Sequence, residues 1–129
     1  MMNPVVHFEL PYHDANRIKE FYSNVFAWTM NQLGPEMNNY ILVNTSDQDV
    51  KRDSLRGSID GGLIASSPNG VSAPSLVLAV EDIHETIALI TKHGGQVLNE
   101  PMDIPGTGLI SYFLDTEGNK NSILQPILM

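Results

Sequence analysis

The chain has 129 residues and a mass of 14.2 kDa, the size of one compact domain or of two small modules that share a core. It contains no cysteine, which excludes disulfides, thiolate metal sites and cysteine nucleophiles. A formal net charge of −8 argues against binding to nucleic acid or to an anionic membrane. Apolar runs are too short to span a membrane and no signal-peptide pattern opens the sequence, so we expect a cytoplasmic protein.

The first half of the chain predicts a strand, a helix and three further strands. Residues 5–10, bounded by prolines, are the first strand. Asp14 stands where a helix N-cap belongs. Apolar residues then recur at helical spacing: Ile18, Phe21, Tyr22, Val25 and Phe26. We expect Phe21 and Tyr22 in this stripe to be core. The next strands are predicted at residues 28–33, 39–44 and 59–65, and the Gly61-Gly62 pair in the last one indicates a close backbone approach or a bulge.

The second half repeats this order after a linker at residues 66–73, which is rich in turn-forming residues. A strand is predicted at residues 75–80. Asp82 is a second N-cap, and it precedes a helix that ends at Gly94-Gly95. Three strands follow, at residues 96–99, 108–114 and 122–128.

The repeated order predicts an α+β fold of two βαβββ modules. Module one covers residues 1–65 and module two covers residues 74–129. Each module alone would leave one sheet face uncovered, so the two modules should pair and bury or enclose that face.

Several short motifs accompany this order. The first module contains His7-Phe8-Glu9-Leu10 and the stretch from Phe21-Tyr22 to Trp28, and the second contains the turn Asp115-Thr116-Glu117-Gly118-Asn119. In their order and spacing these pieces resemble the vicinal oxygen chelate superfamily, which includes glyoxalase I, bleomycin-resistance proteins and extradiol dioxygenases. Ala27 stands where that family has a glycine. The resemblance spans nearly the whole chain and implies paired βαβββ modules in a curved, partly open sheet around a cavity.

The resemblance also implies a divalent metal in that cavity, held by residues from both modules. Of the four ligand positions, only the first is well matched, by His7. Ser75 and Ser122 stand at two others, and Asp60 is the only carboxylate near the fourth. Neutral hydroxyls supply no charge to offset dehydration of the ion, and a catalytic metal usually takes three or more imidazole or carboxylate ligands. We therefore expect an incomplete or absent metal site and no cofactor. The alternative is a divalent metal on a variant set drawn from His7, Glu9 or Asp60.

Glu9 is the most informative candidate residue. It shares a strand face with His7, because side chains alternate along a strand. A carboxylate within an apolar strand is costly to bury unless it is paired or faces a wet cavity. We therefore expect Glu9 to line the cavity, where a dry environment would suit it to proton transfer.

The candidate residues for ligand binding are those that the predicted cavity would bring together. Glu9 is also the candidate catalytic residue. Each of the others has a structural explanation as well: a satisfied imidazole for His7, packing for the aromatic residues, and ordinary strand positions for the serines. The predicted ligand-binding set is His7, Glu9, Trp28, Tyr40, Ser75 and Ser122.

Three functions follow from these predictions. The first is a glyoxalase/bleomycin-resistance-like protein that binds a small organic molecule in the inter-module cavity. The second is a metal-dependent lyase, isomerase or dioxygenase of the same superfamily, in which the metal polarises two vicinal oxygens of the substrate. The third is a non-catalytic, oligomeric interaction protein. The resemblance also implies a homodimer.

Overall fold

The structure is a computed structural model that describes residues 2–46, 59–67 and 70–127. The chain divides into two compact units, and each is described by itself. One unit comprises His7–Pro74. The other joins the residues up to Val6 to those from Ser75 onward. The N-terminal residues belong with the second unit because the Ala79 amide donates a hydrogen bond to the Pro4 carbonyl, at 2.9 Å.

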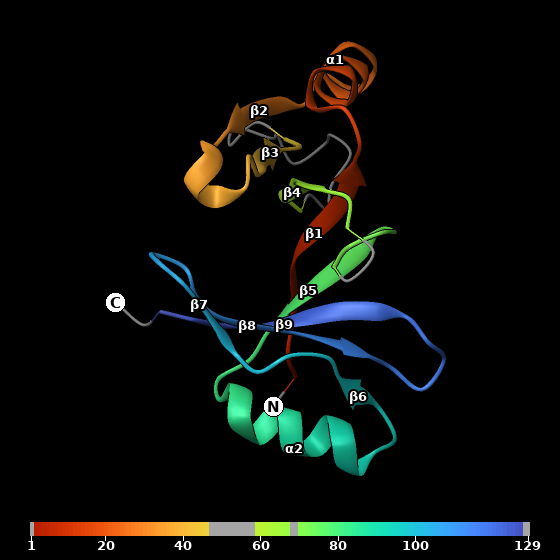
Figure 1. Cartoon of the computed structure of the whole chain (residues 1–129), viewed down its shortest axis with the longest axis vertical. Helices are drawn as coiled ribbons and strands as arrows, with labels where there is room; N and C mark the ends of the chain where they lie inside the picture. Colours follow the sequence, from red (N-terminus) through yellow and green to blue (C-terminus); the bar gives the residue numbers. More distant parts are fainter. Residues whose placement is uncertain (1, 47–58, 68–69, 128–129) are drawn as a thin grey trace, which may run out of the picture. The chain divides into compact units, whose positions relative to one another are not determined.

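The first unit carries one helix and four strands (Figure 1). The strand order is β2-β3-β4-β1, with β1 and β4 parallel and the other pairs antiparallel. The elements are β1 (Val5–Tyr12), α1 (Ala15–Phe26), β2 (Thr29–Gln32), the short 3₁₀ helix η1 (Pro35–Met37), β3 (Ile41–Asn44) and β4 (Gly61–Ala65).

Helix α1 begins and ends at well-defined caps. The Asp14 side chain accepts a hydrogen bond from the Arg17 amide at 3.0 Å, as the sequence predicts for an N-cap. At the other end, Ala27 adopts a left-handed conformation with φ of 61°, and its amide donates to the Ser23 carbonyl. This conformation is the usual helix stop and is normally taken by glycine, so the alanine here is strained.

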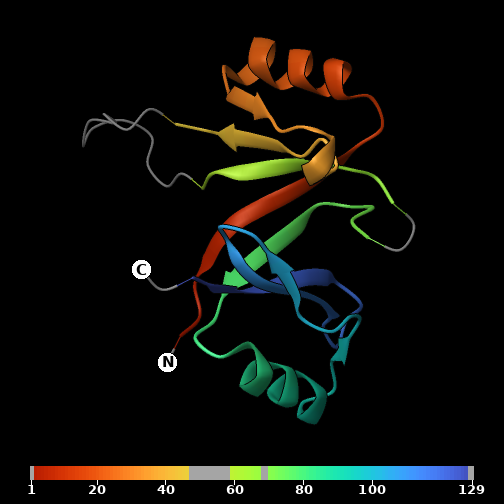
Figure 2. The ribbon, with the colours of Figure 1, turned by 60° about the vertical axis from the view of Figure 1, so that its left-hand side comes forward.

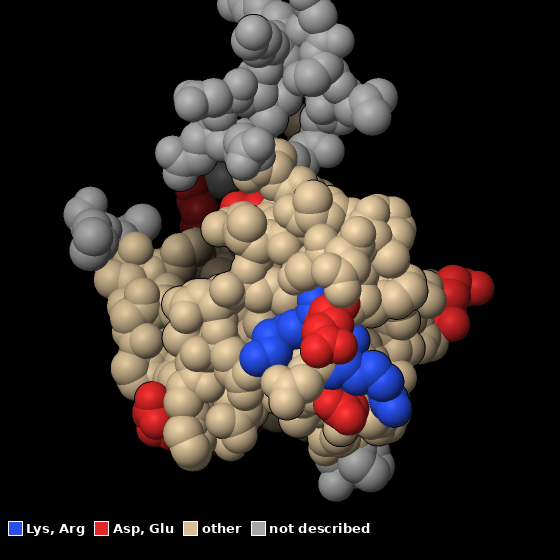
Figure 3. All heavy atoms as spheres, turned by 90° about the horizontal axis from the view of Figure 1, so that it is seen from above, with Lys and Arg blue, Asp and Glu red and all other residues tan. Residues whose placement is uncertain are grey.

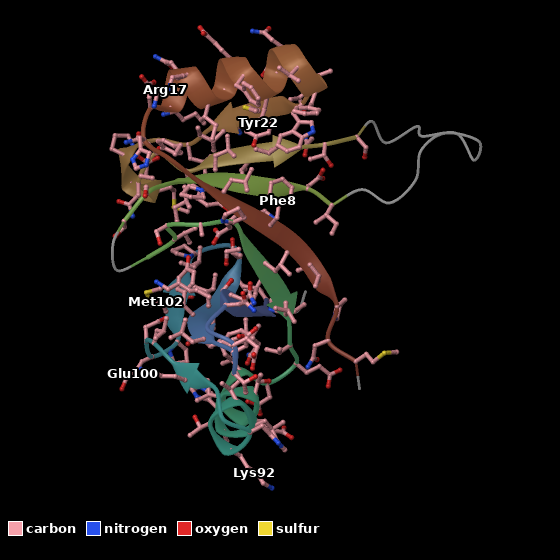
Figure 4. The ribbon with its side chains drawn as sticks, turned by 90° about the vertical axis from the view of Figure 1, so that its right-hand side faces the viewer. Phe8, Arg17, Tyr22, Lys92, Glu100 and Met102 are labelled. Atoms are coloured by element: carbon pink, nitrogen blue, oxygen red, sulfur yellow. The ribbon has the colours of Figure 1, made fainter. Side chains whose placement is uncertain are left out.

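The core of the first unit lies between α1 and one face of its sheet (Figure 2). Its buried members are Tyr12, Ile41, Val43 and Leu63, and Phe8, Leu10, Ile18, Trp28 and Met30 pack against them. Figure 4 shows side chains, Tyr22 among them, filling the space between the helix and the strands. Tyr22 stacks on Trp28, with ring centroids 4.5 Å apart.

The predicted apolar stripe of α1 is only partly core. Phe21 is 53% exposed, and Val25 and Phe26 are exposed to a similar degree, so the expectation that Phe21 is core is wrong. No residue of α1 is buried, and these three exposed apolar residues all lie in the C-terminal half of the helix. Figure 3, seen from the α1 end, shows that most of this surface is uncharged; the basic side chains gather in one place beside acidic ones, and further acidic side chains lie apart from them.

The second unit carries one helix and five strands. The strand order is β5-β9-β8-β6, with β7 paired to β8. Its core joins Val80, Ile83 and Ile123 to partly buried residues of α2 and β8. The elements are β5 (Ser75–Ala79), α2 (Ile83–Lys92), β6 (Gln96–Val97), β7 (Met102–Ile104), β8 (Gly108–Leu114) and β9 (Lys120–Pro126).

The structure confirms the α+β class and finds both predicted βαβββ successions. Both aspartate caps are also as predicted, since the Asp82 side chain accepts from the amides of His84 and Glu85. Strand β7 is an addition that the sequence does not predict. It is three residues long and lies next to Pro101, so its pattern is too short to signal a strand. In the described part of the chain, no helix has the length and apolarity needed to cross a membrane.

Replacing Ala27 with glycine should stabilise the protein by about 0.5–1 kcal/mol. Glycine removes the left-handed strain, which outweighs the extra freedom it gives the unfolded chain. The free energy of unfolding from urea denaturation measures the effect. The matched control is Ala88→Gly in the interior of α2, which should destabilise by about 1 kcal/mol. If Ala27→Gly were less stable than the wild type, the conclusion that Ala27 is strained would be wrong.

Candidate functional site

The candidate site lies in the first unit, on the side chains of β1 that point away from α1. Because side chains alternate along a strand, Phe8, Leu10 and Tyr12 face the helix, and His7 and Glu9 face the other side of the sheet. Glu9 is only 5% exposed, although it is a carboxylic acid. Burying such a group is costly unless it is hydrogen-bonded, so its partners decide what the site does.

Tyr40, which immediately precedes β3, joins these two residues. Its hydroxyl donates a hydrogen bond to Glu9 Oε2 at 2.9 Å. The same hydroxyl lies 2.9 Å from His7 Nε2. We call His7, Glu9 and Tyr40 the polar cluster. Its three members come from positions 7, 9 and 40, so the cluster depends on the sheet that brings β1 and β3 together on either side of β4.

Gly62 makes room for the polar cluster. In β4 it pairs with Glu9 on one side and with Leu42 on the other. A Cβ atom at this position would lie only 1.8 Å from the Tyr40 hydroxyl oxygen. The neighbouring Gly61 makes room for Phe8 on the opposite face, where a Cβ would lie 2.5 Å from the Phe8 ring. The groups that come close to the glycine pair are therefore side chains, rather than the backbone that the sequence predicts there.

The direction of the two hydrogen bonds fixes the tautomer of His7. The single hydroxyl proton of Tyr40 goes to Glu9, so in the bond to His7 the Tyr40 oxygen must accept. Nε2 then carries the proton, and Nδ1 of a neutral His7 carries the lone pair. Among the described residues, none donates a hydrogen bond to Nδ1. His7 therefore offers an acceptor to a molecule bound at this face.

The pKa of His7 lies below its ordinary value of 6.5, because burial disfavours the charged imidazolium. The negative charge of Asp60, next to β4, opposes this shift and raises the pKa. The Asp60 side chain accepts a hydrogen bond from the Thr45 amide at 3.0 Å, which holds the carboxylate in place. His7 is thus neutral at pH 7, as its role as an acceptor requires.

The donor atoms present do not fit the divalent metal that the family resemblance implies. His7 Nε2 is already engaged in a hydrogen bond with the Tyr40 hydroxyl, at 2.9 Å. The Ser75 hydroxyl donates to the Lys120 carbonyl at 2.9 Å. Within residues 2–46, 59–67 and 70–127, no three His, Asp or Glu side chains gather closely enough to hold an ion.

The other predicted ligand-binding residues make no hydrogen bond within the polar cluster. Trp28 packs on the helix side of the sheet, against Phe8 and Tyr22, and so is on the face opposite the polar cluster. Ser75 and Ser122 belong to the second unit. The Ser122 hydroxyl is fully buried, and it lacks a hydrogen-bond partner within the described structure.

Sequence reasoning names all three members of the polar cluster but misses the contact that unites them. Tyr40 enters only as an aromatic residue for a pocket wall. The available signal is Gly62, since a glycine in a strand marks a place where another group comes close. Nothing in the sequence says which group that is.

The substitution Gly62→Ala should destabilise the protein by about 1–3 kcal/mol, because the new methyl group displaces the Tyr40 hydroxyl. In a Tyr40→Ala background the same substitution should cost much less. A double-mutant cycle of urea-denaturation free energies measures this coupling. Gly70→Ala is the matched control, because a Cβ there meets nothing closer than 3.4 Å. If Gly62→Ala lowered the free energy of unfolding equally in both backgrounds, the close contact between Gly62 and the Tyr40 hydroxyl would be refuted.

Replacing Asp60 with asparagine should lower the pKa of His7 further, because the charge that favours the imidazolium is lost. Asparagine keeps an oxygen that can accept from the Thr45 amide. An NMR titration of the His7 ring protons gives the pKa directly. Asp103→Asn in the other unit is the control and should leave the titration unchanged. If Asp60→Asn left the pKa of His7 unchanged or raised it, the electrostatic contact would be refuted.

Comparisons with known proteins agree with this fold. The family model described as the Glyoxalase/Bleomycin resistance protein/Dioxygenase superfamily matches residues 5–123. A "Glyoxylase-like domain-containing protein" of Didymella fabae is 28% identical over 119 residues, covering 89% of this chain and 88% of that protein.

Solved structures show the same fold at low identity. A hypothetical protein of Bacillus halodurans C-125 matches with a TM-score of 0.70 and 12% identity, covering 100% of this chain and 98% of that one. A variant of the methylmalonyl-CoA epimerase of Streptomyces coelicolor, in complex with 2-nitronate-propionyl-CoA, matches with a TM-score of 0.68 and 14% identity over 100% and 98% of the two chains. The family model covers nearly all of the sequence, so the chain belongs to the Glyoxalase/Bleomycin resistance protein/Dioxygenase superfamily.

Proposed function

We propose that this protein binds a small organic molecule at the polar cluster without the help of a metal ion. The observation that carries the proposal is the buried Glu9, held beside His7 by one shared tyrosine hydroxyl. A buried acid is a cost to the fold, and burial lowers the pKa of the histidine beside it. Such groups gather where a protein binds or transforms a ligand.

The chemistry of the polar cluster selects the ligand. His7 Nδ1 is the acceptor that faces no described donor, so the ligand should carry an N–H or O–H group. Leu42 lies on the same face of the sheet and is 42% exposed, which adds an apolar surface beside the polar anchor. We therefore expect a small alcohol, phenol or amine with an apolar body.

Proton transfer is a second candidate function, and the line of hydrogen bonds from His7 through Tyr40 to Glu9 favours it. When Nδ1 takes a proton from a substrate, the Nε2 proton can pass to the Tyr40 oxygen and the hydroxyl proton to Glu9. The arrangement follows the general logic of a base oriented by a second and a third group. In this scheme Glu9 is the final proton acceptor, and a substrate with an acidic C–H bond is required.

Two further expectations belong to this proposal. We expect a homodimer, on the strength of the family resemblance, and a cytoplasmic location. Both are independent of the polar cluster, so neither decides whether a ligand binds there.

A thermal-shift screen tests the proposal, with a panel of small alcohols, phenols and amines in the presence of EDTA. A ligand at about a hundred times its Kd should stabilise the wild-type protein by about 2.7 kcal/mol. His7→Ala should abolish this stabilisation, because the acceptor is lost. His13→Ala is the matched control, since His13 is exposed and lies outside the cluster.

Two outcomes would decide against binding at this site: a panel that stabilises nothing, or hits that bind His7→Ala as well as the wild type. Hits with an acidic C–H bond are then incubated in D₂O with the wild type and with Glu9→Gln. Deuterium uptake that is lost in Glu9→Gln supports proton transfer, and hits without exchange restrict the function to binding.

A further inference from the structure

We propose that the Tyr40 hydroxyl occupies the position that a divalent ion would need between His7 and Glu9, so that the phenol keeps metals out of the polar cluster. The inference rests on the same cluster as the proposed function. It makes Tyr40 the residue that determines which kind of ligand the site accepts.

The geometry makes the hydroxyl and a metal ion mutually exclusive. A ligand to His7 Nε2 must lie in the ring plane, along the direction in which Nε2 now donates to Tyr40. A metal ion would sit about 2.0–2.1 Å from the nitrogen. The Tyr40 oxygen lies 2.9 Å away in that direction, so ion and oxygen would be only about 1 Å apart. Glu9 Oε2 lies 2.9 Å from the same oxygen, so both ligand atoms are turned toward one hydroxyl.

The phenol is firmly seated in this position. The Tyr40 backbone is held at both ends, because its carbonyl accepts from the Leu33 amide at 2.8 Å and its amide donates to the Met37 carbonyl at 3.1 Å. The next residue, Ile41, is fully buried. At its far end the hydroxyl fits over Gly62, where any larger residue would collide with it. A metal ion would have to displace a side chain that is held at its backbone and at its hydroxyl.

Removing the phenol should therefore open the cluster to metals. In Tyr40→Ala, the Nε2 atom of His7 and the carboxylate of Glu9 face a vacated space. An imidazole and a carboxylate are suitable ligands for cobalt or zinc. We expect Tyr40→Ala to bind Co²⁺ at least about tenfold more tightly than the wild type, the usual scale of changes in the surroundings of a metal site.

Calorimetric titration with CoCl₂ alone tests this, on the wild type, on Tyr40→Ala and on Tyr40→Ala combined with His7→Ala. The gain should appear in the single variant and disappear in the double variant. Tyr12→Phe is the matched control, because Tyr12 is a buried phenol of the same unit that donates to the Asn39 carbonyl at 2.8 Å. It should bind Co²⁺ no better than the wild type.

A gain that survives the loss of His7, or a folded Tyr40→Ala variant with no gain, would overturn the inference. A second measurement does not need a variant. Nitrogen-15 NMR of the wild type should show the Nε2–H tautomer of His7, and its Nε2 resonance should not move when ZnCl₂ is added. A saturable shift of Nε2 would also refute the inference. Because no organic molecule is present, these results are independent of the screen in EDTA that tests small-molecule binding.

Discussion

The candidate site depends on one oxygen atom. The Tyr40 hydroxyl donates a hydrogen bond to a buried carboxyl group and also binds the ring nitrogen of a half-buried imidazole. Without it, both groups would lose a hydrogen bond in a place where water does not easily replace one. Gly62 is part of the same arrangement, since the space left by its missing side chain is the space that the hydroxyl fills. The three residues of the polar cluster and Gly62 thus depend on one another through hydrogen bonds and packing.

Much of the fold could be predicted because short stretches of the sequence, such as helix caps and apolar patterns, indicate its helices and strands. Asp14 and Asp82 each precede an apolar helical stripe, and both cap their helices by accepting backbone amides. Strand β7 gives no such signal, because three residues are too few to show a period. The exposure of Phe21 is another matter: the stripe shows which residues of a helix are apolar, but what packs against the helix decides how many of them are covered.

The site was predictable only in part, for a related reason. His7 and Glu9 share a face because of the alternation of one strand, which can be read from the sequence. The contact of both with Tyr40 joins residues more than thirty positions apart, and strand order rather than spacing creates it. Ser122, which the family resemblance places against a ligand, is buried with its hydroxyl unsatisfied in the described structure, and sequence spacing carries no information on this.

The parallel pairing of β1 with β4 also determines how the site comes into being. This pairing joins Phe8 to Gly61 and Tyr12 to Ala65, so it closes a loop that contains the helix and two strands of the unit. Contacts of such long sequence separation form slowly, because the entropy of the whole loop is lost before they are made. The polar cluster spans this closure, because Glu9 lies on β1 and Tyr40 precedes β3, on the two sides of β4. The cluster therefore cannot assemble until β1 has paired with β4, whichever other contacts of the unit form first.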